Sequence, residues 1–293
     1  MRQQQAYWPS ETSMSDLQIR RIPFEFENVD FIWNPEQPAF SAMMNMISVM
    51  AIGLEKYFCR AMADAEAVIR DEAVREEARL FRMQEAIHSQ AHKLHVGALI
   101  QRYPGLRETM EAVIASYDAL YEQHPLRFHL GYAGGLEAIF TPFFKMLIDH
   151  RQTLFAGGDA RVASLFLWHF CEEIEHRSSA LTVFNAVVGN PFYRLRTTGA
   201  WRRHSSTIAK LIYEGFKAHV ADTPHEIYKQ NPLKDVPRAA KIISGVGILE
   251  SQAPWHRPER ARIPDYYAQW RESYERGEDV RLIYGRRPEE LAA

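Results

Sequence analysis

The sequence predicts an all-α protein built on four long helices, with a shorter crossover helix between two helix pairs and additional helices toward the C-terminus. Three observations predict this fold. Apolar residues recur with helical spacing over four long segments. Pro-Gly and Gly-Gly pairs separate several of these segments. Each segment also carries one glutamate within its apolar stripe, and two of these glutamates are followed by a histidine three residues later.

Composition limits the class of protein. The chain has 293 residues, of which 46% are hydrophobic and 25% charged, so it can bury one large core. A net charge of −2 gives no reason to expect nucleic acid or anionic lipid as a partner. Cys59 and Cys171 are too few for a disulfide framework. No apolar run approaches a membrane span, and the N-terminal residues do not resemble a signal peptide. We therefore expect a cytoplasmic protein.

The first segment, residues 1–36, is predicted to be irregular because three prolines interrupt it. Phe24, Phe26, Phe31 and Trp33 alternate with polar residues. This pattern predicts either a short strand or an extended arm that lies over the bundle.

Two bundle helices follow. The first is predicted over residues 37–67, with Glu55 inside its apolar stripe, and the second over residues 71–103. Pro104-Gly105 ends the second helix. Its inner stripe is unusually rich in imidazoles and reads Phe81, Glu85, His88, His92, His95 and Leu99.

A shorter amphipathic helix over residues 106–124 occupies the place of a crossover. The third bundle helix is predicted over residues 126–155, with a kink near Glu137 because Pro142 removes a backbone hydrogen bond. After Gly157-Gly158, Asp159 is the expected N-cap of a fourth helix that continues without a break to about residue 188.

The chain is therefore divided into three parts. Residues 1–36 form the irregular N-terminal arm, and residues 37–190 form a four-helix dimetal bundle. Residues 191–293, rich in proline, arginine and aromatic residues toward their end, form a helical extension packed on the bundle.

Six residues predict a metal site: Glu55, Glu85, His88, Glu137, Glu173 and His176. A glutamate and a histidine three residues apart share one face of a helix. One such pair is weak evidence because helices are rich in glutamate. Two pairs, each accompanied by a single glutamate on another helix, match the layout of a dimetal site in a four-helix bundle.

Charge balance supports two divalent ions, because four carboxylates and two neutral imidazoles would then form a neutral buried cluster. Glu85 and Glu173 are expected to bridge the ions, with Glu55 and Glu137 as terminal ligands. Mixed nitrogen and oxygen ligands suit iron, manganese or zinc, and the sequence does not choose among them.

Three neighbouring residues are candidates for catalysis. His92 lies one turn after His88, and His169 lies one turn before Glu173. Either could be a seventh ligand or could form a hydrogen bond with the cluster. Thr141, one turn after Glu137, could touch bound oxygen or could bond its own helix. Glu172 and Glu175 are expected on other faces of the helix, solvated or paired.

These motifs resemble those of the ferritin-like dimetal carboxylate superfamily over about residues 37–190. More narrowly, Glu85-x-x-His88-x-x-x-His92 and His169-x-x-x-Glu173-x-x-His176 resemble the bacterial family called predicted metal-dependent hydrolases, over about residues 20–275. The superfamily resemblance implies a ferritin-like four-helix bundle and a di-iron centre that activates oxygen.

Three functions follow as hypotheses. The first is an oxygen-activating oxidoreductase that uses dioxygen and an electron donor on a small, largely apolar molecule. The second is a metal-dependent hydrolase that uses a metal-bound hydroxide, with His92 or His169 as general base. The third is non-catalytic iron handling. The superfamily resemblance favours the first, with iron as the expected metal, and the sequence leaves a homodimer as an open alternative to a monomer.

Overall fold

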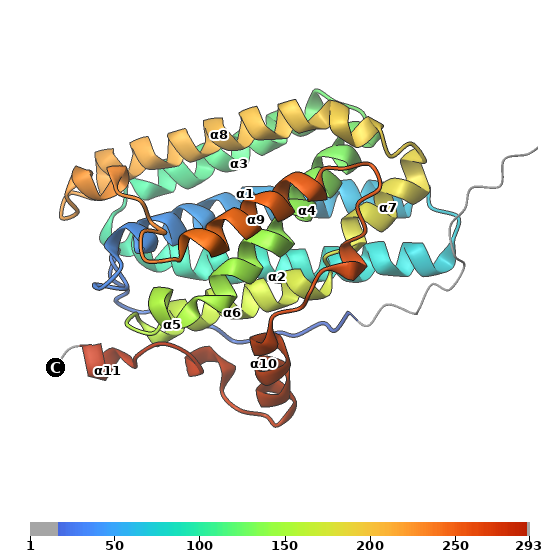
Figure 1. The fold of residues 1–293 in the computed structure, drawn as a ribbon. Coiled ribbons are helices and arrows are strands. Elements are labelled where there is room, and N and C mark those ends of the chain that lie inside the picture. Colours follow the sequence, from blue (N-terminus) through green and yellow to red (C-terminus); the bar gives the residue numbers. More distant parts are fainter. Residues whose placement is uncertain (1–16, 292–293) are drawn as a thin grey trace, which may run out of the picture.

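The computed structural model describes residues 17–291, and this part of the chain is helical, with one isolated β-bridge between Asp159 and Arg286 (Figure 1). The all-α prediction is confirmed. The α-helices are α1 (Pro38–Glu66), α2 (Glu72–Arg102), α3 (Leu106–Glu122), α4 (Leu126–Asp149), α5 (Arg151–Leu154), α6 (Ala160–Glu175), α7 (Ser179–Val188), α8 (Tyr193–His219), α9 (Arg238–Ser251), α10 (Asp265–Glu275) and α11 (Pro288–Leu291). Three short 3₁₀ segments are η1 (His225–Lys229), η2 (Pro258–Arg260) and η3 (Val280–Leu282).

The long helices α1 and α2 pack against each other along their length. Their bounds agree with the predicted bounds to within one residue at each end. Asp71 caps α2, because its carboxylate accepts hydrogen bonds from the backbone N–H groups of Ala73 and Val74 at 2.9 and 3.1 Å. Helix α3 packs on α1, and α8 packs on α3 and α4.

The prediction of one continuous fourth helix was wrong. Helix α6 ends at Glu175, His176 is its C-cap, and α7 begins at Ser179. The N–H of Ser179 bonds the carbonyl of His176 at 2.8 Å, which is the tight turn of a helix end. The guanidinium of Arg177 satisfies the free carbonyl of Ile174 at 2.6 Å. The break therefore lies directly after a predicted metal ligand.

The third predicted helix is also divided. It ends at Asp149, and the short helix α5 follows after His150, whose ψ of 22° is not helical. Pro142 lies inside α4 as predicted. The kink expected near Glu137 stays a prediction.

The N-terminal arm is extended, as one of the two predicted forms. Residues 17–37 contain no helix or strand, while residues 1–16 lie outside the described part. Phe24, Phe31 and Trp33 are buried, and the Trp33 ring packs against Phe40 at 6.0 Å. The arm is therefore part of the core and brings polar residues such as Arg20 into contact with the bundle.

The C-terminal segments lie on the outside of the bundle. Helix α9 packs on α4, and α10 contacts α4 and α6. The backbone N–H of Arg286 bonds the carbonyl of Gly158 at 2.8 Å, which ties the end of the chain to the start of α6. The division into three domains stays a prediction.

One helix in the described residues, α1, is long and apolar enough to cross a membrane by length and composition, but 78% of its most apolar window is buried inside the protein. A core helix passes the same test.

Candidate metal centre

The six predicted ligands meet inside the bundle. Helix α1 supplies Glu55, α2 supplies Glu85 and His88, α4 supplies Glu137, and α6 with its C-cap supplies Glu173 and His176. All six side chains are at least 97% buried, and His169 on α6 is equally buried. The helical faces predicted from the sequence are therefore the inner faces of the bundle.

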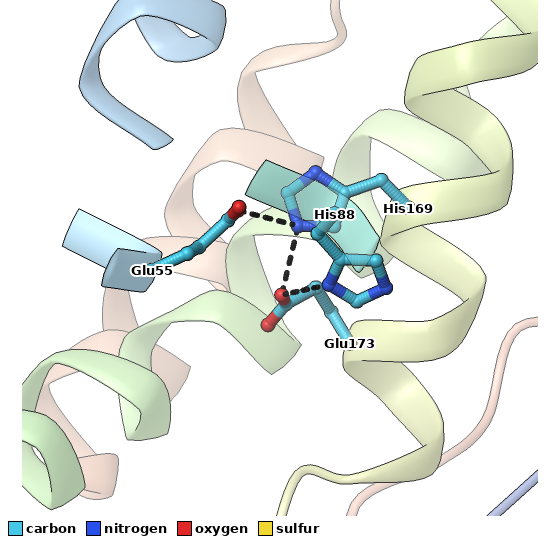
Figure 2. Close-up of side chains that lie close together, drawn as sticks. All are labelled: Glu55, His88, His169 and Glu173. Atoms are coloured by element: carbon cyan, nitrogen blue, oxygen red, sulfur yellow. Dashed lines mark hydrogen bonds and ion pairs between the residues drawn. The ribbon is translucent and has the colours of Figure 1, made fainter. Parts of the chain in front are cut away.

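The donor atoms form two overlapping groups. In each group, one donor atom from each of four residues lies within 4.8 Å of the others. The first group, shown in Figure 2, contains Glu55, His88, His169 and Glu173. The second contains Glu85, His88, Glu173 and His176. Both groups share His88 and Glu173, so the two positions are adjacent.

Glu173 lies at the centre of the first group. Its Oε1 is 2.8 Å from His169 Nε2 and 3.7 Å from His88 Nδ1. Glu55 Oε1 is 3.3 Å from the same His169 nitrogen (Figure 2). The two imidazoles therefore direct one nitrogen each toward the carboxylates.

His176 lies at the centre of the second group. Its Nε2 is 3.3 Å from Glu85 Oε1 and 3.6 Å from Glu173 Oε1, and its Nδ1 is 3.5 Å from Glu137 Oε2. Glu137 thus approaches the second position, although it is not one of the four residues that define that group.

Several buried polar atoms of the cluster have no hydrogen-bond partner among the described residues. They include both oxygens of Glu85 and Glu137, one oxygen of Glu55 and of Glu173, Nδ1 of His88 and both nitrogens of His176. Buried polar atoms are normally paired, because an unpaired one costs about 1–3 kcal/mol. So many unpaired donors and acceptors in one place fit a site for divalent metal ions.

The electrostatics of the cluster lead to the same conclusion. Burial, followed by repulsion from neighbouring carboxylates, raises the pKa of Glu55, Glu85 and Glu173 well above the ordinary value. Burial lowers the pKa of His88, and lowers that of His169 to about 3. Divalent cations would favour both the charged carboxylates and the neutral imidazoles.

His88 is oriented by a buried ion pair. Its Nε2 lies 2.8 Å from Glu172 Oε2, and Glu172 Oε1 lies 3.0 Å from Arg20 Nη1. A carboxylate can only accept, so His88 Nε2 carries the proton and Nδ1 is left to face the cluster. Glu172 is paired, one of the two expected outcomes, but it is fully buried behind His88, a predicted ligand.

Arg20 is held in turn by the C-terminal extension. Its guanidinium also bonds both oxygens of Glu175, at 2.8 and 2.7 Å, and lies over the rings of Trp270 and Tyr274. Sequence reasoning missed Arg20, which is 152 residues from Glu172. No local pattern indicates that contact.

A second chain of hydrogen bonds lies behind His169. His169 Nδ1 is 2.8 Å from His92 Nε2, His92 Nδ1 is 2.6 Å from Ser48 Oγ, and Ser48 Oγ is 2.9 Å from His95 Nδ1. If His169 Nε2 offers a lone pair to a metal, Nδ1 must donate to His92, His92 must donate to Ser48, and Ser48 must donate to His95. Each hydrogen bond of this chain then joins one donor to one acceptor.

The remaining predicted residues take different places. His169 joins the donor groups, whereas both nitrogens of His92 are occupied by His169 and Ser48. His92 is therefore not free to act as a general base, and its expected catalytic role becomes a positioning one. Thr141 is buried on α4, and no described hydrogen bond joins it to the cluster.

Aromatic rings close the site. The ring of Trp168 packs on His88 at 5.0 Å, that of Phe81 on His176 at 4.7 Å, and that of Phe144 on His169 at 6.1 Å. Two surface hollows of about 530 and 730 Å³ include no residue of the cluster in their walls. The cluster is thus shielded from solvent.

A family model described as "predicted metal-dependent hydrolase" matches residues 18–249. The match spans Arg20, all cluster residues and the histidines behind them, and it ends before α10. No curated protein and no solved structure matches the chain.

Proposed function

The chain belongs to the family of predicted metal-dependent hydrolases, and from this premise we propose that it hydrolyses a small organic substrate with divalent metal ions held by the buried cluster. The observation that carries the proposal is the set of six buried nitrogen and oxygen donor residues arranged in two overlapping groups, with the buried Glu137 beside the second. The favoured oxidoreductase hypothesis has less support, because the family description names hydrolysis.

The donor set suits two ions if His88 serves only one of them. Its Nε2 is engaged by Glu172, and one nitrogen lone pair binds one metal ion. His88, His169, Glu55 and one oxygen of Glu173 would then hold the first ion. Glu85, Glu137, His176 and Glu173 would hold the second, so that both ions would draw on Glu173.

A bound divalent ion lowers the pKa of a water ligand and supplies a hydroxide nucleophile near neutral pH. We assign the proton acceptor to Glu55. Its Oε2 is buried and has no described hydrogen-bond partner, while its Oε1 faces His169. Burial and neighbouring carboxylates raise its pKa in the metal-free protein, and a bound divalent ion would favour the charged form that accepts a proton. His169 and the aromatic rings orient the carboxylate and exclude bulk water.

The architecture proposed for this site is ferritin-like. Four helical units surround the cluster, namely α1, α2, α4 and the α6–α7 pair, and α3 makes the crossover. Helical bundles of this kind place one glutamate on each of two helices and a Glu-x-x-His pair on each of the other two. The positions of Glu55, Glu137, Glu85 and Glu173 support this assignment.

The test compares metal content with hydrolysis. Wild-type protein is loaded separately with zinc, manganese and ferrous iron, and is assayed on ester, amide, lactone and phosphoester substrates. We expect metal-dependent cleavage of at least one class. Glu55→Gln should lose cleavage while keeping metal at the second position, assigned to Glu85, Glu137, Glu173 and His176. Hydrolysis that persists in chelator-treated protein would overturn the proposal.

Oxygen activation is the second candidate, and the closed aromatic wall of the cluster favours it, because a reactive intermediate needs shielding from water. Reduced iron-loaded protein would then consume dioxygen in the presence of an electron donor and cleave none of the substrates. That result would replace hydrolysis by the oxidoreductase function.

A further inference from the structure

Helix α9 exposes its large apolar side chains. Ile243 is 71% exposed and Leu249 74%, and Ile242 and Val246 on the same face are 55% and 48% exposed. Helices on the surface of a globular protein normally turn such side chains toward the core. The orientation of α9 is therefore the reverse of the usual one.

The inner face of α9 consists of small residues. Ser244 Oγ donates a hydrogen bond to the carbonyl of Pro142 at 3.1 Å. At Gly247 a Cβ atom would lie only 2.9 Å from Cβ of Pro142, so a larger residue would push the helix away. Small residues thus let α9 lie close against α4, while its large apolar side chains are exposed.

The exposed apolar residues of the chain are concentrated here. Eleven large apolar side chains are exposed among residues 17–291, and six of them lie between residues 242 and 263. Two more, Phe192 and Leu195, flank Arg194, whose guanidinium bonds the carbonyls of Ser251 and Ala253 at the end of α9. These contacts join the two groups into one surface, here called the α9 surface: Phe192, Leu195, Ile242, Ile243, Val246, Leu249 and Trp255.

Positive charge surrounds this surface. Residues 238–262 contain five lysines and arginines and two glutamates, which gives a local charge of +3 in a chain whose total is −2. Arg238, Arg257 and Arg260 are exposed and have no ion-pair partner in the described part of the chain. The total charge, which gave no reason to expect anionic lipid, conceals this local excess.

We propose that the α9 surface binds the interface of an anionic lipid bilayer. An amphipathic helix with outward apolar residues, an exposed tryptophan and flanking arginines has the chemistry of an interfacial segment. A second copy of the chain is a poorer partner, because a two-fold contact brings the same surface, with its excess of positive charge, against itself. Anionic headgroups neutralise that charge.

The test uses full-length protein and two kinds of vesicle. One contains phosphatidylcholine alone, and the other contains equal parts of phosphatidylcholine and phosphatidylglycerol. We expect co-sedimentation with the anionic vesicles, weakened by salt, and a blue shift of tryptophan emission that Trp255→Phe removes. Absence of binding to the anionic vesicles would overturn the proposal.

Matched variants assign the binding to the α9 surface. Ile243→Ser combined with Leu249→Ser should weaken binding by roughly tenfold or more. Arg257→Gln combined with Arg260→Gln should weaken it by about fivefold per charge. The control pair, Val68→Ser with Leu94→Ser, removes apolar residues that are 55% and 43% exposed elsewhere and should change nothing.

Sedimentation velocity of the lipid-free protein tests whether a second copy of the chain, instead of lipid, covers the α9 surface. If the free protein is a dimer and the double variant Ile243→Ser with Leu249→Ser is a monomer, the partner of the α9 surface is another copy of the chain. That result would overturn the lipid proposal. Equal loss of vesicle binding in the control pair would also contradict it.

Discussion

Two of the histidines that face Glu173, His88 and His169, are held in place by different means. His88 is backed by Glu172 and Arg20, an ion pair assembled from α6 and the N-terminal arm. His169 is backed by His92, Ser48 and His95, a chain of neutral groups on α1 and α2. Both arrangements leave one imidazole nitrogen facing the cluster, but only the first depends on buried charge.

The difference has energetic consequences. A buried charge that loses its partner is strongly destabilising, whereas an unpaired neutral group costs only about 1–3 kcal/mol. A carboxylate behind a histidine also makes that histidine a stronger metal ligand. We therefore expect the ion pair behind His88 to contribute more to the free energy of unfolding and to metal affinity than the neutral chain behind His169.

The largest effect on metal affinity is expected at Glu173, which faces both His88 and His169. Glu173→Gln removes the carboxylate that faces both His88 and His169. Metal affinity should fall by more than about 100-fold, measured by calorimetric titration and elemental analysis. Metal-free protein should become more stable, because one of several repelling carboxylates is neutralised. Glu76→Gln, an exposed change on α2, is the control, and unchanged metal content in Glu173→Gln would contradict the assignment.

The next effect concerns the ion pair. Arg20→Met leaves Glu172 and Glu175 near the core without their cation, so the free energy of unfolding should fall by about 3–5 kcal/mol. Metal affinity should fall by roughly tenfold or more, because His88 loses part of its support. Urea unfolding and metal titration measure both. Arg21→Met is exposed and should be nearly neutral; a similar loss there would assign the effect to the arm as a whole.

The neutral chain should be sensitive to acid. Burial lowers the pKa of His95 to about 4 from its ordinary value of 6.5. Between these pH values the folded state thus binds fewer protons than the unfolded state. The contribution of His95 to the free energy of unfolding is therefore fully present above pH 6.5 and is lost as pH falls toward 4. The loss from His95 is up to roughly 3 kcal/mol. Unfolding measured against pH should show a shallower acid decline for His95→Leu than for wild type.

The exposed His225 provides the control for that experiment, because His225→Leu should leave the acid decline unchanged. An identical decline in wild type and His95→Leu would show that the neutral chain is not the acid-sensitive part of the site.

The smallest effect is expected at Ser48. Ser48→Ala leaves the facing nitrogens of His92 and His95 unpaired and should cost about 1–2 kcal/mol of stability. Metal affinity should fall by about tenfold or less, since the link is two residues from His169. Ser89→Ala removes a comparable buried hydroxyl, bonded to the carbonyl of Ile52, and should lower stability without changing metal affinity. Equal affinity losses in both variants would exclude a positioning role for Ser48.

The sequence by itself determined the helices and the inner face of each. The bounds of α1 and α2 agreed to within one residue, because caps, prolines and apolar spacing are local signals. Burial of Glu55, Glu85, Glu137 and Glu173 also followed from position, since a residue inside an apolar stripe turns inward with its neighbours. The break after His176 was not indicated, because side chains from elsewhere in the fold, such as Glu77, stabilise it.

Only the tertiary structure decided how the ligands are supported. His92 lies one turn after its Glu-x-x-His pair and His169 one turn before its own. His169 faces the cluster and His92 stands behind it, because the packing of α1, α2 and α6 sets their depth. Arg20 contacts Glu172 because the arm lies over the bundle, and Trp270 of α10 lies against the same guanidinium. Such contacts depend on distances between segments far apart in the chain, and periodicity within one helix carries no information about them.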